Sequence, residues 1–539
     1  MSPKPVIKIK KRDGRIVAFD KKRIVLAISK AGEATNAYDK KEAIRLADIV
    51  VAILEKTVNG GVPEVEQIQD IVEQCLMAAD HYEAAKAYIL YRQRHEKIRQ
   101  EKAALGIVDD LDLPMNALRV LKSRHLKRNA DGDVIETPGQ LFERVSKALA
   151  QVDSDYKHSK KEINQYAQQY YDMMVSGDFI PGGSYLRNAG YGGPMSNCHV
   201  LGMPDDIAGI YESIKQTAIL TKSAGGGVGF NFSHIRPAGD YIASSGGLST
   251  GPVSFMRIVD MSNTIIGMGG YRKGASMGVL NINHPDILEF INAKQGGRDL
   301  TTFNVSVGVT DSFMKAVEKG DEYNLVNPRT NKPVSQLNAR AVFDLICSLA
   351  HDNGDPGMLF LDTANKTNPL PGLGPLESTN ICGEQWLHPY DVCNLGSINL
   401  ANFVTNGSVD YDKLERITAL ATRFMDNGVD LSTYAVPEVQ EMAKANRRIG
   451  LGVMGWADML IQLEIPYDSD KAITLAKKIM KTIDDTAYNT SSELAREKGN
   501  FANYDKSIFK KKKTPMRNAA RTTVAPTGSI SMVADCSSG

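Results

Sequence analysis

The first hundred residues follow two hydrophobic periods, and each period predicts a different kind of element. Ile7 and Ile9 alternate with lysines, which is the pattern of a half-buried strand. Asp13-Gly14 then supplies residues that a tight hairpin turn favours, so residues 15–19 are expected to form the return strand. Apolar residues at helical spacing follow at about 21–32, 40–57, 64–79 and 81–100. Residues 1–102 are therefore predicted to form a small, separate domain.

The hydrophobic pattern changes after this domain. Residues 103–139 are charged and poorly patterned, as in a linker, and residues 140–195 are mostly helical in their spacing. In residues 196–539, short apolar runs alternate with amphipathic stretches. Repeated β–α units predict an α/β fold with a largely parallel sheet or barrel, whose functional sites lie at the ends of its strands.

The segment Asn380-Ile-Cys-Gly-Glu384 carries an amide, a thiol and a carboxylate within five positions. It lies between a loop rich in proline and glycine and an apolar run, 395–404, that is typical of a strand. In extended backbone, side chains two residues apart point to the same side, so Asn380, Cys382 and Glu384 could face one substrate. For an isolated cysteine, burial beside an ordinary loop glutamate is the commoner situation. The rest of the chain has to decide between these two interpretations.

Two glycine-rich loops offer places for an anionic ligand, and a third, Gly225-Gly-Gly227, precedes a predicted strand. The loop Gly269-Gly-Tyr-Arg-Lys-Gly274 carries two positive charges. Residues 522–531 lead from a predicted strand into a turn of Gly, Ser and Thr, and a helix after that turn would present free backbone N–H groups to an anion. Taken alone, each loop is better explained as an ordinary turn or a helix cap, because such turns are common.

Composition narrows the class of protein. Acidic and basic residues nearly balance, at 63 and 64, so nothing indicates a face that binds nucleic acid directly. No apolar run reaches the length of a membrane span, and the N-terminus lacks the apolar core of a signal peptide, which predicts a cytoplasmic protein. The six cysteines have no zinc spacing, so they are expected to be buried, catalytic or redox-active, and no metal site is predicted.

The basic hairpin at the N-terminus resembles a known regulatory module. Lys11-Arg12-Asp13-Gly14, followed by Phe19-Asp20 and Arg23-Ile24, resembles the ATP cone. The resemblance implies that Lys11 and Arg12 contact the phosphates of an allosteric nucleotide, ATP or dATP, with Asp20 and Arg23 in the same site. Without that resemblance, the basic residues around the hairpin would be interpreted as a solvated surface.

The chain from about Phe142 to Gly539 resembles the large chain of ribonucleotide reductases, and among these the adenosylcobalamin-dependent, class II type. The motifs that carry this resemblance follow one another in the family's order. They are Asn197-Cys198, Gly225-Gly-Gly-Val-Gly-Phe-Asn-Phe232, Gly251-Pro-Val-Ser-Phe-Met256, Gly269-Gly-Tyr-Arg-Lys-Gly-Ala275, Asn281-Ile-Asn-His-Pro-Asp-Ile287, Asp355-Pro-Gly357, Asn380-Ile-Cys-Gly-Glu384, Cys393-Asn-Leu-Gly-Ser-Ile398 and Ala525-Pro-Thr-Gly-Ser-Ile-Ser531. The fold implied is a ten-stranded α/β barrel with the radical cysteine on a finger loop inside it, preceded by a mostly helical ATP cone with a small β-hairpin.

The resemblance also implies which residues carry the chemistry. Replacing the 2′-OH of a ribose by hydrogen begins with removal of a hydrogen atom from C3′, which a thiyl radical can achieve and an ordinary acid or base cannot. By resemblance, Cys382 becomes that thiyl, Glu384 is the general base on the 3′-OH, and Asn380 holds the sugar hydroxyls. Cys198 and Cys393 are the dithiol that closes a disulfide, which requires their Cα atoms to lie within about 7 Å.

Binding sites, a cofactor and partners are implied in the same way. The substrate is a ribonucleoside di- or triphosphate, and the choice between the two stays open. Its contacts are implied at Asn197, Ala224, Gly225, Gly226, Pro526, Thr527, Gly528, Ser529, Ile530 and Ser531. A deoxynucleoside triphosphate that selects the next substrate is implied at a dimer interface, on Asp205, Asp206, Ile207, Arg236, Arg272 and Lys273. Adenosylcobalamin, a homodimer and a thioredoxin- or glutaredoxin-like reductant complete the expectation.

Two departures from the family and three alternatives accompany this interpretation. The chain ends at Gly539, before the family's last barrel strands, which predicts a truncated, split or intein-interrupted protein with a separate C-terminal half completing the barrel. Gly182-Gly183-Ser184 stands where relatives usually have a less flexible Asn-Ser-Pro-like stretch. The alternatives are a class I large subunit that receives its radical from a metalloprotein, a glycyl-radical enzyme, and a nucleotide-sensing ATP-cone protein without catalysis.

Overall fold

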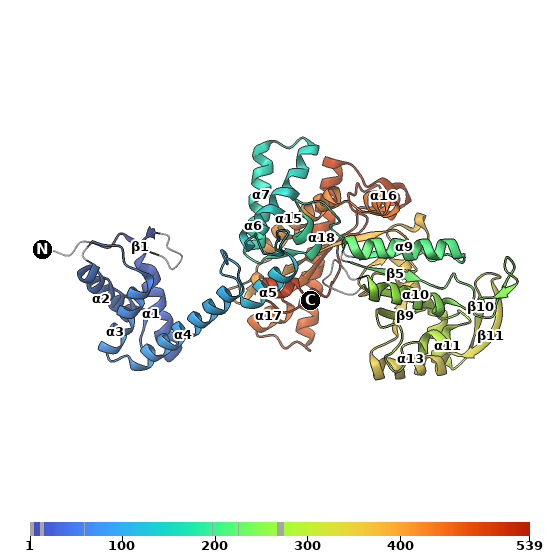
Figure 1. Ribbon diagram of the computed structural model, residues 1–539, viewed down its shortest axis with the longest axis horizontal. Helices are drawn as coiled ribbons and strands as arrows, with labels where there is room; N and C mark the ends of the chain where they lie inside the picture. The colour runs from blue at the N-terminus through green and yellow to red at the C-terminus, as the bar shows by residue number, and fades with distance from the viewer. Residues whose placement is uncertain (1–4, 11–15, 59, 197, 225, 267–273) are drawn as a thin grey trace. The chain divides into compact units, whose positions relative to one another are not determined.

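The computed structural model divides the chain into two compact units, Met1–Ile107 and Val108–Gly539 (Figure 1). It describes residues 5–10, 16–58, 60–196, 198–224, 226–266 and 274–539, without the side chains of residues 95, 98, 99, 103, 198 and 224. Within these ranges, no helix combines the length and the apolar character that crossing a membrane requires.

Within its described residues, the first unit contains four helices and a two-stranded hairpin, as the hydrophobic periods predict. Its elements are β1 (Lys8–Lys10), β2 (Ile16–Ala18), α1 (Lys21–Thr35), α2 (Lys40–Val58), α3 (Val65–Ala78) and α4 (Tyr82–Ala104). The strands pair antiparallel with Ile9 opposite Val17. Helix α1 begins at Asp20, whose side chain accepts a hydrogen bond from the backbone N–H of Lys22. The four helices enclose an apolar core of their own, which includes fully buried Ile28.

The described part of the second unit begins with helices, and one strand of the central sheet, β3 (Phe179–Pro181), lies between the last two of them. These helices are α5 (Met115–Arg124), α6 (Pro138–Gln151), α7 (Lys160–Val175) and α8 (Gly183–Asn188). Thr137 caps α6 and Ser159 caps α7, each within a capping box. The stretch 103–139, which the sequence suggested as a linker, contains α5, and this helix buries Leu118 and Leu121.

The centre of the second unit is one eight-stranded sheet. Its strands are β3 (Phe179–Pro181), β4 (Cys198–Leu201), β5 (Gly227–Asn231), β8 (Ser276–Asn281), β9 (Phe303–Val309), β12 (Gly357–Phe360), β15 (Val392–Asn399) and β18 (Ile449–Met454). The order is β12-β9-β8-β5-β4-β15-β18, with β3 paired to β15. The pairs from β12 to β4 and the pair β15–β18 are parallel, whereas β15 runs antiparallel to β4 and β3. The prediction of a mixed α/β fold is confirmed. The sheet forms a curled half-barrel, and its closure into a ten-stranded barrel stays a prediction.

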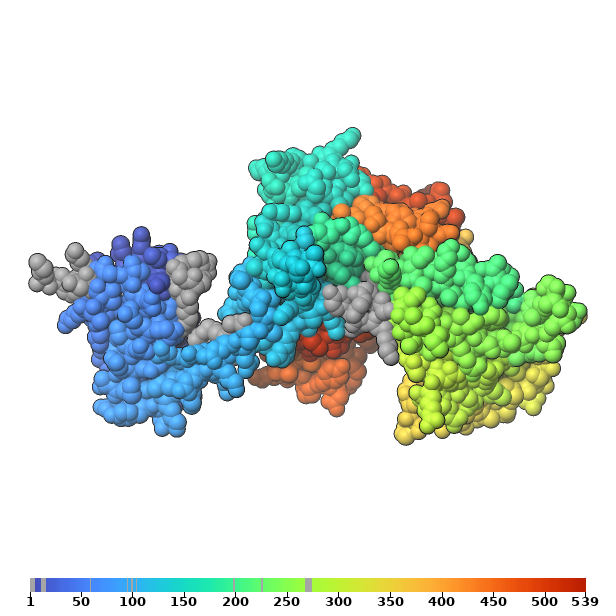
Figure 2. Space-filling model, in the orientation of Figure 1, coloured from blue at the N-terminus to red at the C-terminus, as the bar shows by residue number. Residues whose placement is uncertain are grey.

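Helices and small hairpins surround this sheet. The helices are α9 (Ile207–Ala224), α10 (Pro252–Ile265), α11 (Ile287–Asn292), α12 (Asp311–Lys319), α13 (Ala339–Asn353), α14 (Leu361–Lys366), α15 (Tyr411–Leu431), α16 (Pro437–Asn446), α17 (Trp456–Gln462), α18 (Asp470–Lys498), α19 (Ile508–Lys512) and α20 (Ile530–Ala534). The hairpins are β6 (Tyr241–Ile242) with β7 (Gly247–Leu248), β10 (Glu322–Asn327) with β11 (Lys332–Asn338), β13 (Ser378–Thr379) with β14 (Trp386–Leu387), and β16 (Val404–Thr405) with β17 (Ser408–Val409). Figure 2 shows that segments 207–224, 252–266 and 274–353, green to yellow, lie together on one side of the second unit.

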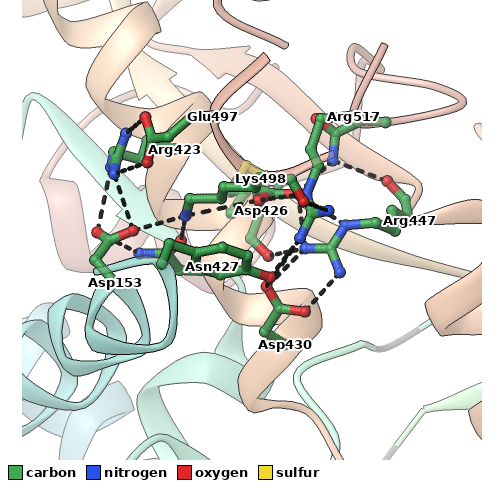
Figure 3. A network of polar contacts seen from close by, with 12 residues as sticks. Asp153, Arg423, Asp426, Asn427, Asp430, Arg447, Glu497, Lys498 and Arg517 are labelled. Carbon is green, nitrogen blue, oxygen red and sulfur yellow. Dashed lines mark hydrogen bonds and ion pairs between the residues drawn. The ribbon is translucent and has the colours of Figure 1, made fainter. Parts of the chain in front are cut away.

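A buried charge network joins α15 and α18 to the segment after α6 (Figure 3). The Lys498 ammonium donates to Asp153 Oδ1 and to Asn427 Oδ1, each at 2.6 Å. The Arg423 guanidinium donates to both carboxylate oxygens of Asp153. Lys498 and Asp153 have fully buried side chains. Because buried charges are tolerated only when they are paired, these contacts fix the two long helices against each other.

The same network explains the one cluster in the described chain whose ligand atoms lie close enough for a metal ion, Asp153 with His158 and Glu497. Arg423 Nη2 lies 3.0 Å from Asp153, 2.9 Å from His158 and 2.6 Å from Glu497. The guanidinium already contacts all three groups, so the cluster is a network of ion pairs around an arginine.

Candidate active site

The Asn-Ile-Cys-Gly-Glu motif forms a tight turn, whereas the sequence suggested an extended segment. The backbone N–H of Asn380 donates to Gln385 O, and the Asn380 side chain accepts from Gln385 N at 3.0 Å. Gly383 has φ +83°, a conformation that glycine adopts readily. Strands β13 and β14 pair on either side, so the motif is the tip of a short hairpin, here called the finger.

Strand β5 accepts the finger because two of its residues have no side chain. A Cβ at Gly229 would lie 1.8 Å from the carbonyl oxygen of Thr379. A Cβ at Gly227 would lie 1.7 Å from Cδ1 of Ile381. The glycine-rich run that precedes this strand and continues into it therefore lets another backbone approach the sheet closely.

Side chains from two other segments hold the finger in place. Asn304 of β9 donates to the carbonyl oxygen of Ile381 at 2.8 Å, and Thr523 donates to that of Glu384 at 3.0 Å. Cys382 lies between these anchors and is exposed. The family resemblance implied a cysteine inside a closed barrel; the described strands form a curled half-barrel in which this thiol is exposed, and the closure stays a prediction.

A cavity of about 260 Å³ collects most of the predicted catalytic and substrate residues. Its lining includes Gly226, Gly227, Asn380, Ile381, Cys382, Glu384, Leu395, Ser397, Ala525, Pro526, Thr527, Gly528, Ser529 and Ile530. Ser531 does not line it; this residue is buried, and its N–H donates to Thr527 O. Asn197 and Gly225 lie outside the described residues, as does the side chain of Ala224. The finger and the 525–530 turn thus face one space although they are far apart in sequence.

The two cysteines predicted to form a disulfide occupy neighbouring strands. Cys393 of β15 is the direct cross-strand partner of Cys198 of β4. Facing residues in an antiparallel pair have Cα atoms about 4.5–5.5 Å apart, which lies within the range of disulfides. The Cys198 side chain lies outside the described structure. Cys393 is fully buried, and burial raises the pKa of its thiol.

Sequence reasoning missed a basic wall of this cavity. The space is also lined by Arg124 of α5, by His125 directly after α5, and by Arg187 of α8. Arg124 Nη1 donates to the Ser529 hydroxyl at 2.6 Å, so it contacts the predicted phosphate-binding turn. The sequence contained one signal of this wall, the Gly182-Gly183 pair. Gly183 leaves room for the His125 ring, because a Cβ at Gly183 would lie 2.8 Å from Cε1 of His125.

Part of the predicted specificity site comes together. Arg236 Nε donates to Asp205 Oδ2 at 2.9 Å, and its backbone N–H donates to Asp205 Oδ1. Asp206 precedes α9 and accepts from the N–H of Gly209 at 2.8 Å. Ile207 is 63% exposed. Arg272 and Lys273 lie outside the described residues.

The predicted cone site is only partly visible. Lys11 and Arg12 lie outside the described residues. Asp20 caps α1, as described above. Arg23 lines a groove of about 600 Å³ between α1 and α4, together with Tyr88 and Tyr91. Whether these residues bind one nucleotide stays a prediction.

Comparison with protein families matches nearly the whole chain. Residues 7–97 match the ATP cone domain, residues 111–194 the all-alpha domain of ribonucleotide reductase, and residues 196–516 its barrel domain. These three matches follow one another without overlap, and the third covers the finger and both cross-strand cysteines.

Individual relatives agree with these matches. A vitamin B12-dependent ribonucleoside-diphosphate reductase of Mycobacterium tuberculosis is 43% identical over 99% of this chain and 76% of its own length. The protein of the same name from Thermoplasma acidophilum is 41% identical over 98% of this chain and 76% of its own length. The ribonucleoside-diphosphate reductase large subunit of vaccinia virus is 31% identical over 71% of this chain and 52% of its own length. The chain therefore belongs to the ribonucleotide reductase family, as a large chain that carries an ATP cone and catalyses ribonucleotide reduction.

Proposed function

We propose that the chain reduces ribonucleotides by a thiyl-radical mechanism in which Cys382 is the radical residue and adenosylcobalamin is the cofactor. The observation that carries the proposal is the finger, because its turn directs Asn380, Cys382 and Glu384 into one cavity with the 525–530 turn. The names of the Mycobacterium and Thermoplasma relatives support the choice of cofactor. The exposed thiol of Cys382 fits it, since a radical formed beside the cavity can reach the sulfur. When bound, adenosylcobalamin supplies that radical.

The chain's own residues account for the remaining steps. The thiyl of Cys382 takes the hydrogen atom from C3′ while the Glu384 carboxylate accepts the proton of the 3′-OH. The 2′-OH leaves as water once it has taken up a proton. Cys198 and Cys393 supply two electrons and two protons, one proton for the leaving 2′-OH and one for C2′, and become a disulfide. Glu384 returns its proton to the 3′ oxygen, and Cys382 returns its hydrogen atom to C3′. The products are therefore one deoxyribonucleotide, one water and one disulfide, which a thioredoxin- or glutaredoxin-like protein reduces.

Regulation and assembly extend the proposal. ATP or dATP binds the cone, and a deoxynucleoside triphosphate binds beside Asp205 and Arg236. A homodimer is supported by large apolar side chains that α9 and α10 expose to solvent. They are Ile207, Tyr211, Met261 and Ile265, each more than half exposed. Analytical ultracentrifugation of Ile265→Asp tests the dimer, because a charge at a buried interface should shift the protein toward monomer.

Substitution of the finger cysteine tests the catalytic assignment. Cys382→Ser should abolish reduction and leave the affinity for nucleotides unchanged, because the hydroxyl is nearly isosteric but does not form the radical. Residual turnover in this variant would refute the thiyl assignment. Once any C-terminal half that completes the barrel is supplied, turnover should need only adenosylcobalamin and a dithiol; a requirement for a metal-containing partner subunit would replace the class II assignment by class I.

A further inference from the structure

A buried histidine lies in the wall of the active-site cavity. His125 follows α5 and is only 6% exposed. Neither Nδ1 nor Nε2 has a hydrogen-bond partner among the described residues. A buried polar group left unsatisfied costs about 1–3 kcal/mol. An apolar side chain would pack there more favourably unless a ligand supplies the missing partner.

The space for this imidazole is created by a glycine. A Cβ at Gly183 would lie 2.8 Å from Cε1 of His125, closer than any stable contact. Gly183 lines the same cavity as His125. The missing side chain at Gly183 therefore makes room for the imidazole of His125 in this wall of the cavity.

Two arginines flank the ring. Arg124 and Arg187 line the cavity beside it, and Arg124 also contacts Ser529 of the opposite turn. Burial, together with the charges of Arg187 and Arg124, lowers the pKa of His125 to about 3. The ring is consequently neutral near pH 7, with one N–H donor and one acceptor nitrogen. Glu384 is the one carboxylate among the described residues that line this cavity.

Positive charge continues on the far side of the same wall. A second cavity, of about 200 Å³, shares Arg124, His125 and Arg187 with the first. Lys127 and Arg128 also line it, and no carboxylate does so among its described lining residues. In Figure 2 the chain from about residue 115 to residue 190, blue to teal, lies at the surface of the second unit. A concentration of cations around a neutral hydrogen-bond donor suits a phosphate group.

We infer that Arg124, His125 and Arg187 form a phosphate subsite that holds the terminal phosphate of the ribonucleotide substrate, opposite the 525–530 turn. The inference rests on the proposed function, because it takes this cavity to be the substrate site. The imidazole N–H donates to a phosphate oxygen, which gives the ring the partner that it lacks. The two guanidinium groups balance the charge of the phosphate, while the turn holds the phosphate nearer to the ribose.

Nucleotides that differ only in their number of phosphates test the subsite. Cytidine mono-, di- and triphosphate are titrated calorimetrically into the purified protein without cofactor, with ATP and a deoxynucleoside triphosphate present to fill the effector sites. One hydrogen bond to a charged group contributes about 1.5–3 kcal/mol. His125→Phe should therefore weaken binding of the polyphosphates about 10- to 100-fold and leave the monophosphate unchanged. His125→Gln should recover part of the loss, because its amide can donate.

Matched variants separate this role from packing. Arg187→Gln should weaken binding of the polyphosphates in the same way. If circular dichroism shows that His125→Phe is unfolded, Arg187→Gln becomes the decisive variant. Arg119→Gln removes a charge from the exposed side of α5 and should change nothing. With cofactor present, His125→Phe should raise KM for the substrate far more than it lowers kcat.

Two results would overturn the subsite. One is equal loss of affinity for all three nucleotides, or no loss at all, in both His125→Phe and Arg187→Gln. The other is unchanged nucleotide binding with weakened binding of adenosylcobalamin, whose own phosphate would then be the ligand of this wall. Failure of the proposed function is a separate result, because Cys382→Ser tests catalysis and leaves this binding step intact.

Discussion

Gly229→Ala tests whether the close approach of the finger to strand β5 positions the thiol of Cys382, which we propose to be catalytic. The added Cβ would lie 1.8 Å from the carbonyl oxygen of Thr379, immediately before the motif that carries Cys382. Ordinary contacts begin near 3.4 Å, so the two atoms must separate by about 1.6 Å. Both partners are backbone-bound and neither can rotate away, so the finger itself has to shift.

The size of the effect follows from this displacement. Overpacking a well-packed site costs about 1–3 kcal/mol of folding free energy. Misplacing a reacting group by about 1 Å can lower the rate about 100-fold. We therefore expect Gly229→Ala to lower the free energy of unfolding by about 1–3 kcal/mol and turnover by about 100-fold or more.

Both quantities are measurable on the same preparation. Urea denaturation followed by circular dichroism gives the free energy of unfolding, and conversion of a ribonucleotide to its deoxy form gives turnover. Gly202→Ala is the matched control, because its Cβ would meet only Pro389, at 3.8 Å. Wild-type turnover and stability in Gly229→Ala, with no change in Gly202→Ala, would show that the finger does not depend on this contact.

Three further properties follow from burial and charge. Lys498→Met leaves the buried carboxylate of Asp153 with one cation fewer, so the free energy of unfolding in urea should fall by about 3 kcal/mol. The hydrogen bond that the His234 ring donates to the Glu377 carboxylate raises the pKa of His234, so the contribution of this pair to stability is complete below the ordinary histidine pKa and is lost as pH rises through the raised value. His234→Gln should flatten that part of the plot of melting temperature against pH. Cys393 should resist iodoacetamide in the native protein and react after unfolding, as mass spectrometry can follow, because its thiol is fully buried.

The stability prediction for Lys498 and the pH prediction for His234 each have a result that would contradict them. Lys481→Met removes one partner of an exposed pair with Asp485 and should change stability by less than about 1 kcal/mol; an equal effect in Lys498→Met would show that the buried network does not stabilise the fold. If His234→Gln left the plot of melting temperature against pH unaltered, the His234–Glu377 pair would make no contribution to the pH dependence of stability.

The sequence alone determined most of the secondary structure. The helical periods at about 21–32, 40–57, 64–79 and 81–100 correspond to α1, α2, α3 and α4, and the alternation of isoleucine with lysine near residue 8 falls at strand β1. These elements were predictable because hydrophobic period, caps and turn residues act between neighbours along the chain. The motifs likewise identified the family, since their order and spacing are properties of the sequence itself.

The conformation of the finger was not predictable in the same way. Local pattern suggested extended backbone through Cys382, but the side chain and backbone of Asn380 close a turn onto Gln385. The turn is stable there because β5 offers two glycines and β9 offers Asn304. None of these partners is adjacent to the finger in sequence, so the local sequence pattern could not predict their contacts with it.

Only the tertiary structure could place the remaining chemistry. Cross-strand pairing sets Cys198 opposite Cys393, and the packing of α5 and α8 brings Arg124, His125 and Arg187 to the cavity. A lone histidine at the end of a helix has no periodic or motif signal. Its meaning depends on the side chain missing at Gly183 and on the charges that surround it, and those become neighbours only when the chain has folded.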